Sequence, residues 1–472
     1  MSRAPEPQIS FADLEFLQQD IRLSPVLQSI SDFLDLHSEL IEKVGGDLER
    51  GLKKPASGRH GLTPAQVLRS LVVMRTKSWD LRELSERIAD GYSLRRFTHF
   101  LSQPVPKHDA FHRAFQRLIP QTLQDINELV LQTAIDLGLE DGTKLRVDCT
   151  VVQTDIHHPT DSTLLWDSVR VLTRLVGHLG QATQQTFSGF RNRTRAARRR
   201  MQALQRMTAQ QRKQQQGKKY RQLIRITEQV VESAGSVLEQ TRKNKGQDLI
   251  QDLAIAQLRQ QIKHYCELGQ RVIDQACRRV LEGELLPPAE KIFSIFEPHT
   301  DLIKRGKIQT PVEFGHKVFL AESAQGLITQ YEVLDGNPAD QDQVEASLLH
   351  HLATFDHPPN SYAGDRGFFS EENLQTCEKK GVQEISIPQR GGKKTLEREV
   401  YEKSASFKKG QRFRAGIEGR ISVLFRGRGM KRCLAQGRER FELFVGAAVL
   451  ANNLLRIADL LIQRSSPKRR AA

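Results

Sequence analysis

Residues 144–153 read KLRVDCTVVQ, and this stretch decides the fold class. Apolar or β-branched residues alternate almost regularly with the polar Arg146, Asp148 and Thr150, as in a half-buried β-strand. The pattern before this stretch and the pattern after Pro159 are both helical. The chain therefore places a strand between two helical regions, which indicates a mixed α/β fold.

Further strand patterns follow much later in the chain. HKVFLAES (316–323) and LITQYEVLDG (327–336) are separated by Ala-Gln-Gly, a hairpin signal. Helical patterns at 341–354 and 371–380 then alternate with short strand patterns at 361–365 and 381–387, and helices are expected at 413–425 and 443–463. We predict one catalytic domain built from residues 141–160 and 290–464.

Residues 1–140 are expected to form a helical N-terminal domain. Thr63-Pro64 provides an N-cap and a first helical residue, and short helices with tight breaks follow. Such spacing is typical of helix-turn-helix units, although three-helix packing without a DNA role is as common. In a basic chain we interpret this region as DNA-binding.

Residues 161–289 are predicted to form a large helical insertion between the strands. Val169, Leu172, Val176 and Leu179 recur near every 3.5 residues, and similar coiled-coil-like seams follow. These seams either close a helical bundle or join two subunits. The insertion also carries a dense basic run, which is either a solvated face or a phosphate-binding surface. The lack of acidic residues in the run favours phosphate binding. Its members are Arg191, Arg193, Arg195, Arg198, Arg199, Arg200, Lys218 and Lys219. Residues 465–472 form a basic tail.

Composition narrows the class of partner and the compartment. The formal net charge of +15 over 472 residues favours a polyanionic partner, most often nucleic acid. The five cysteines are scattered without a C-x-x-C spacing, which argues against a zinc module and a disulfide framework. No uninterrupted apolar run of about 18 residues is present. We expect a bacterial cytoplasmic protein that does not span a membrane.

Three acidic residues are candidates for metal-dependent chemistry, and each also has a simpler explanation. Asp148 lies in mid-strand, where it could face solvent. Asp365 ends a strand but precedes Arg-Gly, a turn pattern. Glu418 lies four residues after Arg414, so the two could form an ion pair on one helix face.

Together the three carboxylates support a stronger hypothesis. Two strand-borne aspartates and one helical glutamate can converge at one sheet edge, and oxygen ligands in this number suit Mg²⁺ or Mn²⁺. Two such ions could activate a water or a 3′-hydroxyl for in-line attack on a phosphodiester.

Several stretches resemble the transposase core of bacterial insertion sequences, namely LRVDCTVVQTDIHHPTDSTLLWD (145–167), VEFGHKVFLA (312–321), YAGDRGF (362–368) and RFRAGIEGRIS (412–422). The resemblance is to the InsH-like group of DDE transposases and covers about residues 60–460. It implies an RNase H-like core, with Asp148 on the first strand, Asp365 on the fourth and Glu418 on the following helix. It also implies two Mg²⁺ or Mn²⁺ ions, double-stranded DNA as substrate, and a homodimer or larger assembly on DNA.

The signature around the glutamate is met in part. Arg414 and Glu418 match the Arg and Glu of the family's Tyr-Arg-Glu-Lys pattern, whereas Gln411 stands for Tyr and Phe425 for Lys, with Arg426 beside it. We expect Arg414, Arg426 and Lys317 to contact DNA phosphates. The predicted function is metal-dependent cleavage and strand transfer at element ends; the alternatives are a nuclease without strand joining and a domesticated DNA-binding protein with an unused site.

Overall fold

The computed structural model describes residues 10–52, 61–242, 244, 246–304 and 311–465. The predicted basic tail therefore lies almost wholly outside the described residues. The chain divides into two compact units, Met1–Gln153 with His316–Ala472 (unit 1) and Thr154–Gly315 (unit 2). Unit 2 extends beyond the insertion expected at 161–289, because it also includes the ends of two long strands and a short strand paired to one of them.

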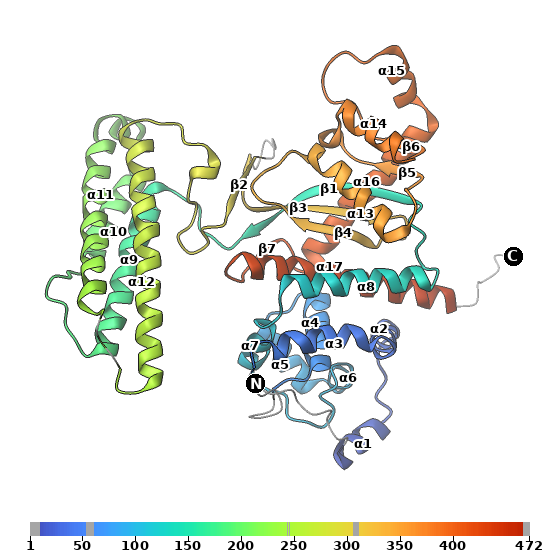
Figure 1. Cartoon of the computed structure of the whole chain (residues 1–472), viewed down its shortest axis with the longest axis horizontal. Helices are drawn as coiled ribbons and strands as arrows, with labels where there is room; N and C mark the ends of the chain where they lie inside the picture. The colour runs from blue at the N-terminus through green and yellow to red at the C-terminus, as the bar shows by residue number, and fades with distance from the viewer. Residues whose placement is uncertain (1–9, 53–60, 243, 245, 305–310, 466–472) are drawn as a thin grey trace. The chain divides into compact units, whose positions relative to one another are not determined.

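One mixed sheet organises the α/β part of unit 1 (Figure 1). The strands pair in the order β4 (Ile328–Val333), β3 (Val312–Ser323), β1 (Lys144–Thr154), β5 (Ser361–Ala363) and β6 (Glu384–Ser386). β3 and β4 are antiparallel and form the predicted hairpin, whereas β1, β5 and β6 are parallel. Two short strands extend the sheet: β2 (Asp301–Lys304) pairs with the unit 2 end of β3, and β7 (Arg432–Cys433) pairs with β1.

Strand alternation separates the two faces of this sheet. Val318 and Leu320 of β3 pack in one cluster with α16 (Ala405–Gly427) and α17 (Arg438–Ser465), whereas Phe319 and Ala321 pack in another with α13 (Val344–Phe355) and α14 (Glu371–Lys379). Leu145, Val147 and Cys149 of β1 belong to the α13 cluster. Because successive strand residues point to opposite faces, Arg146 and Asp148 point toward α16.

The N-terminal region is helical, as predicted, and shares its core with the C-terminal helix. Thr63 caps the helix that begins at Pro64, and Gln66 closes the capping box. Buried residues of this region join Leu450, Leu454 and Ile457 of α17 in one hydrophobic cluster. The helices are α1 (Phe11–Gln18), α2 (Pro25–Leu36), α3 (Ser38–Glu49), α4 (Pro64–Lys77), α5 (Leu81–Asp90), α6 (Tyr92–Phe97), α7 (His108–Phe115) and α8 (Pro120–Asp136).

Helix α17 is strongly apolar along much of its length, and its position in the fold explains this composition. It is the one helix in the described part of the chain that is long and apolar enough to cross a membrane, with a mean hydropathy of 1.6 over its most apolar window of 18 residues. However, 67% of that window is buried inside the protein, against α8, α2, α4 and the sheet. Burial on several sides requires an apolar helix, so this composition is that of a core element.

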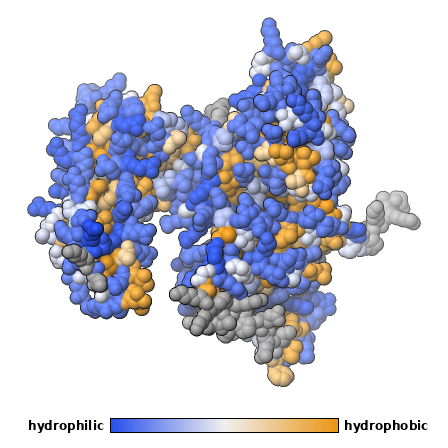
Figure 2. Space-filling model, in the orientation of Figure 1, coloured by the Kyte–Doolittle hydropathy of each residue, from blue (hydrophilic) through white to orange (hydrophobic). Residues whose placement is uncertain are grey.

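Unit 2 is a bundle of four helices: α9 (Asp161–Thr183), α10 (Thr194–Gln205), α11 (Ala209–Gln240) and α12 (Leu249–Ala276). The predicted seams face one another inside it, and Leu172, Leu179, Leu223 and Ile262 are fully buried. The alternative that these seams join two subunits is therefore wrong, because their apolar surface is already used within the chain. The visible face of the bundle is mostly hydrophilic (Figure 2).

The buried His351 of α13 gives a pH-dependent stability. It is 2% exposed and its ring lies 4.5 Å from the Phe355 ring. Burial, followed by the charge of His357, lowers its pKa from 6.5 to about 4. Between about pH 6.5 and pH 4, His351 is therefore protonated in the unfolded chain but not in the folded protein. The free energy of unfolding falls as the pH drops from about 6.5 toward 4.

We expect this loss to reach about 3 kcal/mol at pH 4, from 1.36 kcal/mol for each pKa unit. Chemical unfolding of wild-type protein and of His351→Leu at several pH values measures it. The free-energy difference between the two should shift in favour of the variant as the pH falls. A pH-independent difference would show that His351 titrates normally in the folded protein.

Candidate catalytic carboxylate site

Asp148 is the most enclosed of the three predicted acids. Its side chain is 13% exposed, its Oδ1 accepts the backbone N–H of Cys149 at 2.8 Å, and its Oδ2 lies 3.1 Å from Nη2 of Arg414. Burial raises the pKa of Asp148 to about 6, an effect that the Arg414 charge opposes and the Asp365 charge reinforces. The explanation of Asp148 as a solvent-facing strand residue does not hold.

Asp365 and Glu418 approach the same place from other elements. Asp365 follows β5 and caps the short helix η4 (Arg366–Phe368), with Oδ1 accepting the Gly367 N–H at 2.7 Å. Its Oδ2 lies 3.7 Å from Arg414 Nη2. Glu418, on α16, is 66% exposed and its Oε1 lies 2.9 Å from Arg414 Nη1. The turn and the ion pair expected for these residues both form, and they aim both carboxylates at the same guanidinium.

Arg414 thus joins all three carboxylates. Its side chain is 17% exposed, and its charge partly neutralises three acids whose mutual repulsion would otherwise separate them. In the described part of the chain, no three acidic, His or Cys side chains are arranged to hold a metal ion as they stand. Carboxylate oxygens are the ligands that Mg²⁺ and Mn²⁺ prefer, and in this structure all three carboxylates are paired with Arg414 instead.

A fourth carboxylate, Asp340, lies beside this site and was not among the candidate acids singled out from the sequence. It begins the short helix η3 (Asp340–Gln343), and its charge also raises the pKa of Asp148. A Cβ atom on Gly367 would lie 2.5 Å from Asp340 Oδ2 and 2.9 Å from Asp365 Oδ1, so both carboxylates crowd this glycine. The Asp-x-Gly pattern at 365–367 was the only sequence signal for this close approach.

Lys317 forms an ion pair with Asp340. Its side chain is 11% exposed, its Nζ lies 2.6 Å from Asp340 Oδ1, and it donates a hydrogen bond to the Pro338 carbonyl at 2.6 Å. Little of the ammonium remains for DNA. Strand alternation turns Lys317 inward, so the expected phosphate contact would require Lys317 to leave Asp340, and that contact stays a prediction.

The two departures from the family signature have structural explanations. Gln411 donates hydrogen bonds to the Ser386 carbonyl at 2.6 Å and the Gly364 carbonyl at 3.2 Å, so it ties α16 to the ends of β5 and β6. Phe425 is half-buried and packs against the hydrophobic cluster between the sheet, α16 and α17. Arg426 is exposed, about 12 Å along the helix from Glu418 at 1.5 Å per residue.

Helix α16 is held to the sheet by a buried carboxylate. Glu322 of β3 is fully buried and lies 2.8 Å from Arg146 of β1 and 2.8 Å from Arg420 of α16. Arg146 also donates to the Phe413 carbonyl at 2.7 Å, next to Arg414. The Glu322 contacts therefore fix the helix that carries Arg414 and Glu418 over the strand that carries Asp148.

The predicted basic run lies in unit 2. Arg191, Arg195, Arg198, Arg199 and Lys218 are exposed, and Arg193, Arg200 and Lys219 are half-buried. On α10 the apolar Ala197, Met201 and Leu204 face the bundle, so the arginines project outward. Within the part of the chain that the structure describes, none of these cations forms an ion pair. Their charge is therefore available to an external anion.

Comparison with known proteins agrees with the resemblance. Residues 302–454 match the family described as transposase DDE domain. The matched region contains Asp365 and Glu418, whereas Asp148 precedes it. No curated protein and no solved structure matches the chain. This match supports the prediction of a DDE transposase, and DNA is the substrate class that the family implies.

The contacts of Glu322 provide a test of how the site is built. Replacing Glu322 with alanine leaves two partly buried guanidinium groups without their carboxylate, so we expect the free energy of unfolding to fall by about 3–5 kcal/mol. Glu332→Ala, at an exposed position of β4, is the matched control and should change it by less than about 0.5 kcal/mol. Denaturant unfolding measures both. Equal stability of the two variants would contradict this role of Glu322.

Proposed function

We propose that this protein is a DNA transposase that cuts and joins DNA strands at the ends of an insertion sequence. The convergence of Asp148, Asp365 and Glu418 on a single cation is the observation that carries the proposal. The match of residues 302–454 to the transposase DDE domain supports it independently. The closer assignment to the InsH-like group rests on the sequence resemblance.

We also propose that the sheet of unit 1 is an RNase H-like core. Asp148 lies on β1, the first strand of the sheet in chain order. Asp365 follows β5, which is the fourth strand when the short β2 beside the far end of β3 is not counted. Glu418 lies on the long helix that comes after β6. This is the placement that the resemblance implies, and the parallel pairing of β5 with β1 brings the two aspartates to neighbouring strands.

In the proposed reaction the carboxylates of Asp148, Asp365 and Glu418 would hold two Mg²⁺ or Mn²⁺ ions. Such ions would polarise the attacking water or DNA 3′-hydroxyl and stabilise the leaving oxygen. Arg414 must first swing away from the carboxylates, which frees its charge for a DNA phosphate. Arg426 extends this cationic edge of α16. We further propose that the protein acts on double-stranded DNA in the bacterial cytoplasm, at the nucleoid, as a homodimer or larger assembly.

The direct test uses purified protein, Mg²⁺ or Mn²⁺, and linear DNA carrying the inverted repeats that flank the gene. Wild-type protein should produce cleaved ends and joined products. Asp148→Asn, Asp365→Asn and Glu418→Gln should each abolish both while binding DNA normally, and Glu332→Gln should keep activity. Cleavage without joined products would identify a nuclease. Full activity of any of the three variants would refute the triad, and binding without chemistry in wild-type protein would favour a DNA-binding role.

Arg414 yields a separate prediction for the DNA-free protein. Because its guanidinium competes for the carboxylates, Arg414→Gln should bind Mn²⁺ about tenfold more tightly at pH 8, where Asp148 is ionised. The estimate corresponds to removing a competing charge-assisted hydrogen bond of about 1.5 kcal/mol. Titration calorimetry measures the affinity, with Arg412→Gln, an exposed arginine on the same helix, as the control. Unchanged or weaker Mn²⁺ binding would contradict the competition.

The basic surface of unit 2 should contribute to DNA affinity without sequence preference. Replacing Arg195 and Arg199 with Gln should lower affinity and reduce the salt slope of log K by about 1.8, from about 0.9 per phosphate contact. Lys263 and Arg271, exposed on α12, serve as a matched pair of controls. Affinity and its salt dependence are measured by fluorescence anisotropy. Equal slopes for both double variants would show that the basic run is only a solvated face.

A further inference from the structure

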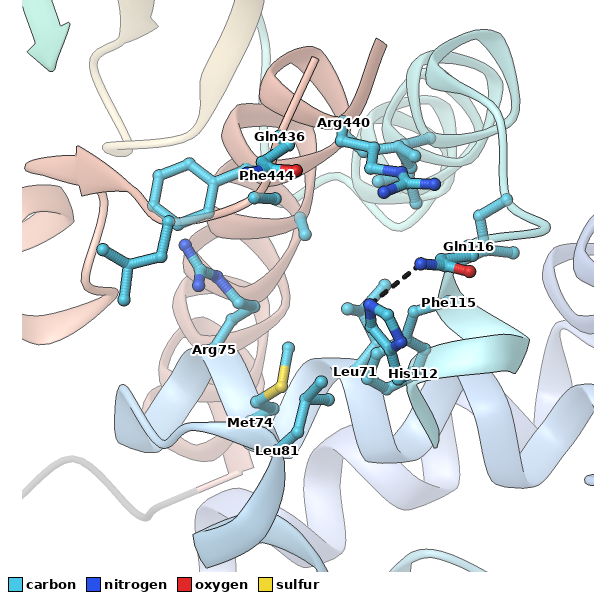
Figure 3. A pocket seen from close by; sticks show the side chains of 16 residues that line it. Leu71, Met74, Arg75, Leu81, His112, Phe115, Gln116, Gln436, Arg440 and Phe444 are labelled. Carbon is cyan, nitrogen blue, oxygen red and sulfur yellow. Dashed lines mark hydrogen bonds between the residues drawn. The ribbon is translucent and has the colours of Figure 1, made fainter. Parts of the chain in front are cut away.

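A pocket of about 400 Å³ lies within unit 1, away from the carboxylates. Its walls come from α4, α7 and α8, the segment after β7, and α17. Most of the lining is apolar, including Leu71, Met74, Phe115 and Phe444, as Figure 3 shows. This size and lining are those of small-molecule sites, which are commonly about 300–1,000 Å³ and mostly apolar.

Arg75 is the unusual member of this lining. It is 8% exposed, and its side chain forms no hydrogen bond or ion pair with the described residues; its Nε and Nη2 atoms are buried without a partner. Its guanidinium lies 4.1 Å from the Phe444 ring centroid, at one side of the space seen in Figure 3. Burial lowers its pKa to about 10, so the group is still charged at neutral pH. An unpaired buried charge is costly unless something compensates it.

The remaining polar groups define which anion would fit. Arg440 contributes a second cation, and His112 and Gln116 contact each other through their Nε2 atoms at 2.9 Å. None of the described residues that line the pocket is acidic. A DNA backbone is a poor fit, because Arg75 is enclosed and the walls are apolar. A carboxylate on an apolar body satisfies both the guanidinium and the walls, and a bidentate pair uses the unpartnered nitrogens.

We propose that this pocket binds a small molecule with an apolar body and a carboxylate group that pairs with Arg75. The apolar body lies against the side chains of α4, α7 and α17, and Arg440 adds charge near the opening. Bound ligand connects the N-terminal helices to α17, whose first half covers the sheet. This binding is distinct from DNA transposition and uses none of the residues of the carboxylate site.

The test uses the full-length protein and two probes of matched shape, 4-phenylbutyrate and the neutral 4-phenylbutan-1-ol. Wild-type protein should bind the carboxylate at least about tenfold more tightly, as measured by calorimetry and by the rise of the unfolding midpoint with ligand concentration. Arg75→Met should abolish this preference. Arg82→Met, an exposed arginine of α5 outside the pocket, should keep it.

A second variant keeps the test informative if Arg75→Met does not fold. Ala447 lines the pocket and is 4% exposed, so Ala447→Phe should fill the space and weaken binding of both probes at least about tenfold. Any one of four results would overturn the proposal: equal affinity of wild-type protein for the two probes, an unchanged carboxylate preference in Arg75→Met, unchanged affinities in Ala447→Phe, or no binding of either probe up to its solubility limit. None of these results bears on the transposase proposal.

Discussion

Glu322 is the residue on which the geometry of the carboxylate site depends, because its buried charge must be matched by cations from two separate elements. Arg146 reaches it from β1 and Arg420 from α16. A fully buried carboxylate that loses such partners becomes an unpaired buried charge, which is strongly destabilising. The strand bearing Asp148 and the helix bearing Glu418 are thereby held at a fixed distance. Gln411 adds a second connection, from the same helix to the carbonyls that follow β5 and end β6.

The carboxylates of Asp148, Asp365 and Glu418 all lie around the guanidinium of Arg414. Three carboxylates that share a small volume repel one another, and the rise of the Asp148 pKa expresses that repulsion together with burial. Arg414 relieves it with a single positive charge. Divalent ions carry more charge and accept more oxygen ligands, so the proposed Mg²⁺ or Mn²⁺ ions would compete with Arg414 for the same carboxylates. In this structure the three carboxylates are paired with Arg414.

The sequence predicted those features that depend on local periodicity. Alternation in residues 144–153 identified β1 and placed Arg146 and Asp148 on one face, and Ala-Gln-Gly marked the β3–β4 hairpin. The contacts that assemble the site could not be predicted, because they join residues 176 and 98 positions apart in the case of Glu322. The pairing of Lys317 with Asp340 could not be predicted for a related reason, because it joins β3 to the segment that follows β4. The seams of the insertion were correctly seen as apolar, but only the packing of α9, α11 and α12 shows that they are satisfied within the chain.

We propose that Asp148, Asp365 and Glu418 hold the metal ions of the reaction. Anomalous X-ray scattering from crystals of the protein bound to DNA ends and soaked in Mn²⁺ would locate these ions directly. We predict Mn²⁺ within bonding distance of all three carboxylates, with the Arg414 guanidinium displaced from them. Ions bound elsewhere, with Arg414 still paired to Asp148 and Glu418, would contradict the claim.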